Sequence, residues 1–267
     1  MNNSLISKEI EKYVRVNQKL NIDNPSTIQD KIAWLKVYDN TYLKSFCADK
    51  LSIHTYSLQK IGKDICVPLL EIYNSVNDID LNALPNSFVL KCNHGCHYNI
   101  IVKDKSTFDL NKAKKQLSEW LQDDYSEHGY EMQYKNIPHI CFAEKYLEND
   151  NGKIIDYKFW CFNGIPKIVT ISSDDVINYF SVDKKILDIS NSYFPRNPNI
   201  LNVFPDTFDI MLDYSKKLSK DFKFVRVDLY SINDNIYLGE LTFTPGNGRM
   251  QYTNSSWNKK LGDMLKL

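Results

Sequence analysis

The chain has 267 residues, long enough for one large domain or two small ones with a buried core. Hydrophobic residues make up 43% and charged residues 25%, which excludes a disordered chain, and the 33 Lys and Arg balance the 33 Asp and Glu. That balance argues against a nucleic-acid partner or an anionic membrane, since both attract excess positive charge. No apolar run approaches the roughly 20 residues of a membrane span, and the N-terminus lacks a signal-peptide pattern, so we expect a cytoplasmic protein.

Short fingerprints of common chemistries are absent. The six cysteines are scattered through the chain, and we expect them to be reduced rather than paired in a disulfide scaffold. The sequence contains no GxGxxG, GxxxxGK[ST], HExxH, GxSxG or CxxC. The function must therefore be read from residues that lie further apart.

Helices are expected in the first third of the chain. Ser26, with Gln29 three residues later, forms a capping-box pattern that predicts a helix start with Ser26 as N-cap. A second helix is expected from about Asp49 to Ile61, because Gly62 suits the left-handed position that follows a helix end.

Short strands follow, with one helix among them. Asp109 is a plausible N-cap for that helix, and a turn is expected at Asp150–Lys153. The strands are expected at Cys66–Leu70, Ser87–Asn93, Asn99–Lys103 and His139–Leu147, with the first at a sheet edge because it contains a proline.

Two hairpins are expected in the second half. Asn163-Gly164 favours a type I′ turn that joins Tyr157–Phe162 to Lys167–Ile171. A helix from about Phe208 to Phe222 leads into the second hairpin, whose strands lie within residues 224–243. Helices and hairpins in this order indicate an α+β fold rather than regular βαβ alternation.

The second hairpin carries charged side chains on one face. Because side chains alternate along a strand, Arg226 and Asp228 point away from their apolar neighbours, and so do Glu240 and Thr242 on the return strand. Two carboxylates on adjacent strands are tolerated most easily with a cation between them, and Mg²⁺ prefers such oxygen ligands. The alternative is an ordinary solvent-exposed sheet face. The glycine-containing turn Thr244–Gly248, which follows directly, favours a ligand because it lets backbone approach one closely.

Lys91 lies within an apolar strand and needs an anionic partner. A buried, unpaired ammonium group is costly, so either a carboxylate or a nucleotide phosphate is expected beside it.

The loop after that strand allows a metal hypothesis. Cys92, His94, Cys96 and His97 are all zinc-type ligands. Their spacing does not match paired zinc motifs, and alternation turns Cys92 toward the core. A core cysteine and a ligand-contacting loop histidine are the simpler interpretation.

Taken in order, several segments resemble one protein family. VLKCNHG, AEKYLE, DYKFWCFNG, FVRVDLY and IYLGELTFTPG are similar to the TupA-like (teichuronopeptide-biosynthesis) branch of the ATP-grasp superfamily, over roughly Lys31 to Tyr252. The resemblance implies an α+β ATP-grasp fold in which two α+β subdomains sandwich MgATP, preceded by a helical N-terminal segment. The expected divisions are residues 1–85 for that segment, 86–148 for the small subdomain and 149–267 for the large subdomain.

The resemblance also implies site residues. Those expected to contact the nucleotide, on its phosphates, adenine or ribose, are Lys91, Asn93, His94, Glu144, Lys145, Leu147 and Glu148. The expected metal ligands are Asp228, Glu240 and Thr242, and the expected catalytic cations near the transferred phosphoryl group are Arg226 and Lys158. The implied cofactors are ATP and Mg²⁺.

Two positions depart from the superfamily pattern. Thr242 stands where members usually carry Asn, although a hydroxyl can still contact Mg²⁺. Cys96-His97-Tyr98 supplies bulk in a loop that is usually rich in Gly and Ser.

The implied function is that of an ATP-dependent carboxylate–amine ligase that forms an amide through an acyl phosphate. The implied partners are ATP, an amino acid or other amine, and a uronic-acid-containing glycan of a bacterial surface polysaccharide or its precursor. Three alternatives remain: an ATP-grasp kinase, a polysaccharide glycosyltransferase, and a non-catalytic glycan- or nucleotide-binding module.

Overall fold

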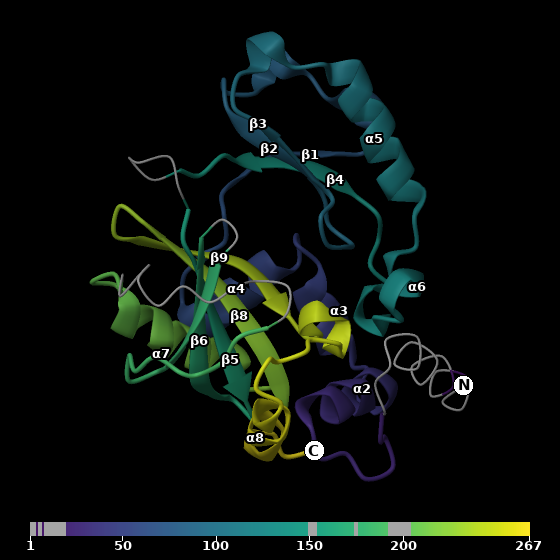
Figure 1. Ribbon diagram of the computed structural model, residues 1–267. Coiled ribbons are helices and arrows are strands. Elements are labelled where there is room, and N and C mark those ends of the chain that lie inside the picture. Colours follow the sequence, from purple (N-terminus) through teal and green to yellow (C-terminus); the bar gives the residue numbers. More distant parts are fainter. Residues whose placement is uncertain (1–3, 5–6, 8–19, 149–153, 174–175, 192–203) are drawn as a thin grey trace.

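The protein has two lobes, each built around an antiparallel sheet (Figure 1). The computed structural model describes residues 4, 7, 20–148, 154–173, 176–191 and 204–267. The expected turn at Asp150–Lys153 falls largely outside these residues. In the described part of the chain, no helix is both long and apolar enough to cross a membrane.

The small lobe contains a four-stranded sheet in the order β1-β4-β2-β3, covered on one face by α5. Alternate residues of β2 (Phe88, Leu90 and Cys92) are fully buried against α5, which confirms the predicted alternation. Its elements are β1 (Leu69–Tyr73), β2 (Phe88–Cys92), β3 (Asn99–Val102), β4 (Cys141–Lys145), α5 (Leu110–Gln122), α6 (Tyr125–Gly129) and the short 3₁₀ helices η1 (Val76–Asp78), η2 (Leu81–Ala83) and η3 (Lys105–Thr107). The 3₁₀ helix η4 (Met132–Tyr134) follows α6 and packs on α3 of the large lobe.

The large lobe contains a five-stranded sheet in the order β7-β6-β5-β8-β9. One face packs on α3, α4 and α7 and holds the largest hydrophobic core, whereas α2 and α8 cover one end of the opposite face. The elements are α2 (Ile28–Tyr38), α3 (Tyr42–Ala48), α4 (Ile53–Ile61), β5 (Asp156–Phe162), β6 (Ile165–Ser173), β7 (Val176–Ser181), α7 (Phe208–Ser219), β8 (Phe224–Ile232), β9 (Asn235–Thr242), η5 (Pro245–Gly248) and α8 (Ser256–Met264).

Both expected hairpins are present. Asn163 and Gly164 have φ values of 49° and 76°, which the type I′ turn requires. In the second hairpin, Arg226 pairs with Thr242 and Asp228 with Glu240, followed by a bulge at Gly239. A side chain at Gly239 would meet the ring of Tyr230 at 2.8 Å, so glycine is needed there.

The helix boundaries differ from the prediction in two places. The N-cap of α2 is Thr27 rather than Ser26, because the Thr27 hydroxyl accepts the backbone N–H of Asp30 while the Asp30 carboxylate accepts that of Thr27. The second helix begins at Ile53 instead of Asp49, because the Asp49 carboxylate accepts a nearby backbone N–H and fixes a turn. Gly62, at φ 88°, ends α4 as predicted.

The expected edge strand is shifted along the chain. β1 spans Leu69–Tyr73 and pairs only with β4, so it lies at the edge of the small-lobe sheet. Cys66 instead forms an isolated bridge with Leu238 of β9 in the large lobe. Thus β1, which lies within the predicted N-terminal segment 1–85, completes the sheet of the small lobe. The predicted boundary between the small and large subdomains, at residues 148 and 149, stays a prediction.

Candidate functional site

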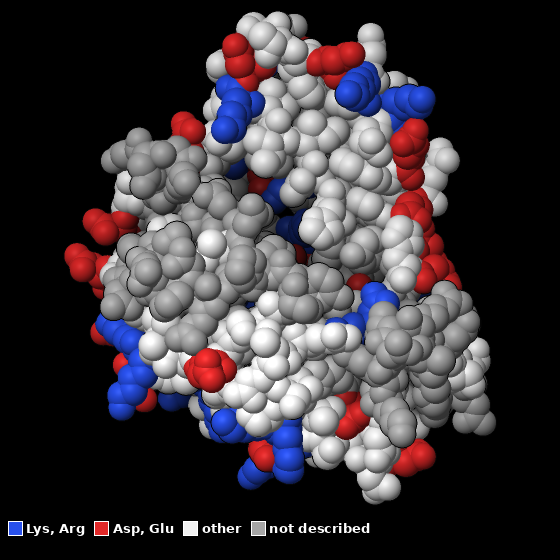
Figure 2. Space-filling view, viewed as in Figure 1, with Lys and Arg blue, Asp and Glu red and all other residues white. Residues whose placement is uncertain are grey.

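A cleft of about 720 Å³ lies between the lobes, and residues of both contribute to its walls. In the space-filling view, the hollow below the small lobe shows basic and acidic side chains in its depth (Figure 2). Arg226, Glu240 and Thr242 of the predicted charged row line the cleft. Asp228 does not line it and lies beside Arg226 on the same sheet face, so the sheet alternation inferred from sequence is confirmed at this point.

Arg226 is the centre of the charged row. Its Nε and Nη2 donate to the two carboxylate oxygens of Asp228 at 2.7 and 2.6 Å, and Nη2 also lies 3.4 Å from Glu240 Oε1. Thr242 Oγ1 donates to Glu240 Oε1 at 2.7 Å, and Lys158 Nζ lies 3.3 Å from Asp228 Oδ2. Asp228 is almost fully buried beneath the two cations, so its charge is balanced inside the protein.

These contacts change the ionisation of the row. Burial raises the pKa of Glu240, but Arg226, Lys50 and the Thr242 hydroxyl outweigh it and lower that pKa to about 2. Burial lowers the pKa of Lys158, but Asp228 and other carboxylates outweigh it and raise that pKa. The carboxylate of Glu240 and the ammonium of Lys158 are therefore both charged at neutral pH.

The donor set fits a hard divalent cation. Asp228 and Glu240 face each other on adjacent strands, and Thr242 adds a hydroxyl oxygen. Carboxylate and neutral oxygens are the ligands that Mg²⁺ prefers.

The small lobe supplies Lys91 from the opposite wall. Its ammonium pairs with Glu144 of β4, which is the carboxylate partner expected for a lysine within an apolar strand. Lys91 lines the main cleft and also a smaller cavity of about 160 Å³. Glu144, Lys145 and Leu147 line that smaller cavity as well, so the structure brings these predicted residues together. Glu148 is exposed and does not line it.

Asn93 and His94 lie away from the described lining of the cleft. Both are buried in the small lobe. Asn93 donates to Asp49 Oδ1 at 2.8 Å and accepts the backbone N–H of Ile140. His94 Nε2 lies 3.0 Å from the carbonyl oxygen of Trp120, and its ring stacks on His139. These contacts give both residues a part in positioning the loop that follows β2.

That loop is packed by aromatic rings. Tyr98 stacks on Trp120 and donates its hydroxyl to Asp123, while its ring approaches Gly95. A side chain at Gly95 would meet the rings of Tyr98 and Tyr125 at 2.7 and 2.8 Å, so glycine permits the close approach. Cys96, His97 and Tyr98 all line the cleft, so the bulky residues noted in the sequence lie beside the site.

Sequence reasoning missed Lys50. It lies between α3 and α4, donates to the carbonyl oxygen of Gly95, and lines the cleft close enough to lower the pKa of Glu240. It forms no ion pair within the described part of the chain. No local pattern marks this lysine, because its position depends on a long-range bond from its backbone N–H to Asn93.

Sequence reasoning also missed the segment after α5. Figure 1 shows α5 and α6 running from the small lobe toward the large lobe. There, Gln133 donates to Thr244 at 3.0 Å, Thr244 donates to Glu131, and Lys36 donates to the carbonyl oxygen of Gly129 at 2.7 Å. This buried polar network ties the small lobe to the loop that follows β9.

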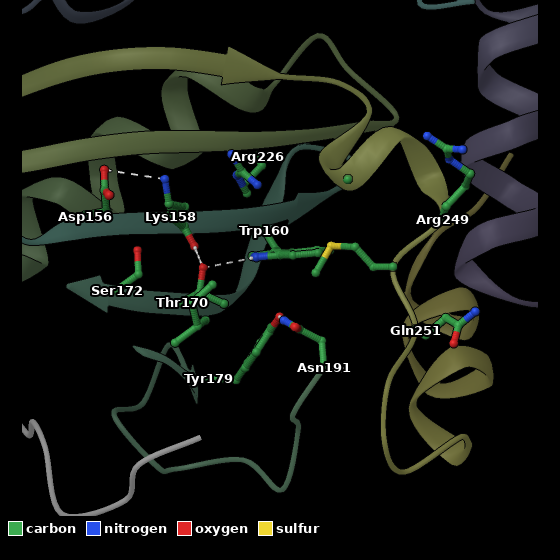
Figure 3. Close-up of a pocket in the computed structure, with 13 residues that line it drawn as sticks. Asp156, Lys158, Trp160, Thr170, Ser172, Tyr179, Asn191, Arg226, Arg249 and Gln251 are labelled. Atoms are coloured by element: carbon green, nitrogen blue, oxygen red, sulfur yellow. Dashed lines mark hydrogen bonds and ion pairs between the residues drawn. The ribbon is translucent and has the colours of Figure 1, made fainter. Parts of the chain in front are cut away.

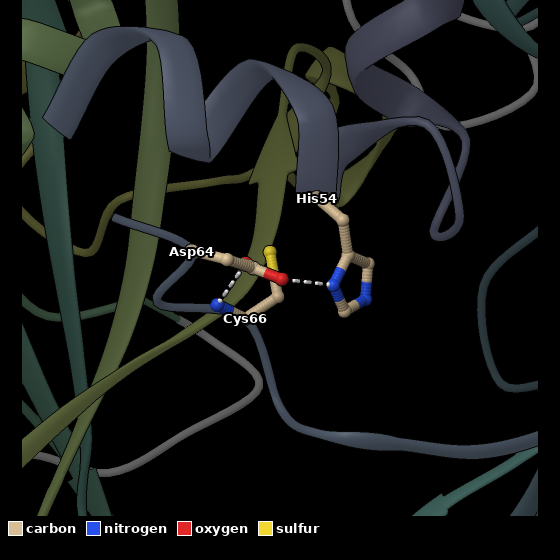
Figure 4. A group of neighbouring side chains, drawn as sticks. All are labelled: His54, Asp64 and Cys66. Atoms are coloured by element: carbon tan, nitrogen blue, oxygen red, sulfur yellow. Dashed lines mark hydrogen bonds and ion pairs between the residues drawn. The ribbon is translucent and has the colours of Figure 1, made fainter. Parts of the chain in front are cut away.

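The zinc hypothesis finds no support in the geometry. Among the described residues, the one cluster of three potential ligands is His54, Asp64 and Cys66, which includes none of the loop residues. In Figure 4, Asp64 already accepts His54 at 2.7 Å and the backbone N–H of Cys66 at 2.9 Å. Burial raises the pKa of the Cys66 thiol, so it stays protonated. Hydrogen bonding therefore accounts for this cluster without an ion.

Comparison with protein families identifies the fold. The sequence profile of the TupA-like ATPgrasp family matches residues 30–266. The chain belongs to this family. It has the ATP-grasp fold, as the resemblance in its sequence implied. None of the curated proteins is a significant match.

Two solved ligase structures are similar to this chain. An L-amino acid ligase from Bacillus licheniformis is 13% identical, with a TM-score of 0.50, over 93% of this chain and 56% of that one. A D-alanine–D-alanine ligase from Bacillus anthracis complexed with ATP is 18% identical, with a TM-score of 0.48, over 82% of this chain and 65% of that one. The TupA-like chain thus spans less than two thirds of the length of these ligases.

Proposed function

We propose that this TupA-like protein is an ATP-dependent carboxylate–amine ligase that forms an amide through an acyl phosphate. The observation that carries the proposal is the pair Asp228 and Glu240 on adjacent strands, beside Arg226 and Lys158 and across the cleft from Lys91. Family membership supports it, because the matched residues 30–266 include all of these positions.

The two cavities suit the two parts of ATP. The smaller cavity, between β2, β4 and the segment after β4, would take the adenine, with Glu144, Lys145 and Leu147 beside it. Lys91 lines both cavities and would bind the phosphates together with Lys158. Asp228, Glu240 and Thr242 would hold Mg²⁺, which neutralises phosphate charge when bound.

The residues would lower the barrier by neutralising charge. The acceptor carboxylate attacks the γ-phosphorus, the bond to the bridging oxygen breaks, and ADP leaves. Both reactants are anions, so Arg226, Lys158 and Lys91 reduce their repulsion and align them. A neutral amine then attacks the acyl carbon, phosphate leaves, and the amine proton passes to phosphate.

The substrates follow from the family resemblance. We propose a uronic acid of a bacterial surface polysaccharide or its precursor as the carboxylate, and an amino acid or other amine as the nucleophile. Because ATP is consumed, we expect the reaction to occur in the cytoplasm.

Turnover and product mass test the reaction class. Purified protein is incubated with MgATP, an amino-acid mixture and uronic acids, and ADP release is measured with and without each component. The ligase predicts ADP release that needs both acid and amine, with an amide product and with activity lost in Asp228→Asn. A phosphorylated product formed without amine would indicate a kinase and contradict the ligase.

A further inference from the structure

A third cavity lies beside the nucleotide cleft on the same face of the large-lobe sheet. It has a volume of about 560 Å³ and is walled by β5, β6, β7 and the segment after η5 (Figure 3). Five residues line both this cavity and the nucleotide cleft: Asp156, Lys158, Arg226, Gly246 and Arg249. The predicted phosphoryl-transfer residues therefore stand at the junction of the two.

The wall of this cavity is rich in uncharged hydrogen-bonding groups. Thr170, Ser172 and Asn191 are all buried and line it, and Asn191 donates to the hydroxyl of Tyr179 at 3.2 Å. The Ser172 hydroxyl has no hydrogen-bond partner among the described residues, and Figure 3 shows it directed toward Asp156 and Lys158. A buried hydroxyl that opens into a cavity suits a ligand that carries hydroxyl groups of its own.

The cavity also carries excess positive charge. Lys158, Arg226 and Arg249 line it, against the single carboxylate of Asp156. Lys158 is paired with Asp156 and Asp228, and Arg226 is paired with Asp228 and Glu240. Arg249, which Figure 3 shows at the far end from Asp156, forms no ion pair in the described part of the chain. A half-buried guanidinium without a carboxylate is suited to bind an anionic group of a ligand.

We propose that this cavity binds the acceptor acid, that the acid is a hydroxylated carboxylate of about the size of a sugar acid, and that Arg249 binds its carboxylate where the cavities join. The proposal rests on the proposed ligase function. Arg226, on the wall shared with the nucleotide cleft, would lie between that carboxylate and the γ-phosphate. Thr170, Ser172 and Asn191 would bind the hydroxyl groups and select against aliphatic acids.

Calorimetry with simple probes tests the proposal. The protein, saturated with the non-hydrolysable analogue AMPPNP and Mg²⁺, is titrated with D-glucuronate, D-glucose and propionate. D-Glucose lacks the carboxylate and would lose the charge-assisted hydrogen bond, whereas propionate lacks the hydroxyl groups and would lose several neutral hydrogen bonds. We expect each of these two probes to bind about tenfold or more weakly than glucuronate. Arg249→Gln should weaken glucuronate binding by a similar factor, and Ser172→Ala by a few-fold. AMPPNP affinity should be unchanged in Ser172→Ala, because Ser172 lines this cavity and does not line the nucleotide cleft. Lys259→Gln removes an equal charge from the exposed face of α8 and should leave glucuronate binding unchanged.

The outcomes separate this inference from the function it rests on. Failure of AMPPNP to bind the folded wild-type protein would overturn the ligase function itself. Normal AMPPNP binding without glucuronate binding, or equal glucuronate binding by wild type and Arg249→Gln, would overturn the acceptor site alone. Propionate binding as tightly as glucuronate would overturn the selection for hydroxyl groups.

Discussion

Glu240 offers a test of the charged row in the free protein. Its pKa, ordinarily 4.5, is lowered to about 2, since Arg226 and its other polar neighbours outweigh the effect of burial. A carboxylate with a lowered folded-state pKa stabilises the fold above its unfolded pKa and loses that contribution as the pH falls. The difference between 4.5 and about 2 corresponds to about 3 kcal/mol. Since 34% of the side chain is exposed, solvent screening reduces this to about 1–2 kcal/mol.

We therefore expect Glu240→Gln to lower the free energy of unfolding by about 1–2 kcal/mol at neutral pH. The difference from wild type should shrink below pH 4.5 and fall by about half near pH 3. Urea unfolding followed by circular dichroism at several pH values measures it. Glu127→Gln, at an exposed carboxylate 3.5 Å from Lys135, is the matched control and should change little. A loss for Glu240→Gln that is independent of pH would refute the charge argument.

Three further changes test other parts of the account. Lys91→Ala should weaken binding of the MgATP analogue about tenfold or more in calorimetry, because a charge-assisted phosphate contact is lost, and unchanged affinity would remove Lys91 from the site. Lys50→Ala should weaken the same binding by a smaller factor; an effect as large as that of Lys91→Ala would mean that Lys50 is a principal phosphate ligand. Gly262→Ala should destabilise the fold by about 2–3 kcal/mol in urea unfolding, because the new methyl carbon would lie 2.1 Å from the carbonyl oxygen of Ser26; equal stability would show that α8 can shift away from α2.

The charged row could be predicted from sequence because a strand places side chains by simple alternation. Once the residues from Arg226 to Thr242 are taken as a hairpin, their face follows without knowledge of the rest of the fold. The need of Lys91 for a partner could also be predicted, because a lysine within an apolar strand is stabilised by an anionic group beside it. In the structure that group is the carboxylate of Glu144.

The remaining site residues depend on long-range packing. Lys50 reaches the cleft because its backbone bonds to the end of β2, and Gln133 reaches Thr244 from a segment more than a hundred residues away. The sequence around Asp49 is compatible with a helix that begins there. In the structure, however, the Asp49 carboxylate accepts a hydrogen bond from the side-chain amide of Asn93. The loop histidine, His94, turns inward because Trp120 offers a backbone acceptor. Tertiary contacts determine where these side chains lie, and local sequence patterns carry no information about such contacts.

The central claim, that Asp228 and Glu240 form a metal-dependent nucleotide site, is tested most directly by titrating AMPPNP into the protein with and without Mg²⁺. The account predicts binding that requires Mg²⁺ in the wild type and falls about tenfold or more in both Asp228→Asn and Glu240→Gln, with each variant folded by circular dichroism. Lys259→Gln should bind like wild type. Absence of binding by folded wild-type protein at millimolar nucleotide, or equal binding without Mg²⁺, would contradict the claim.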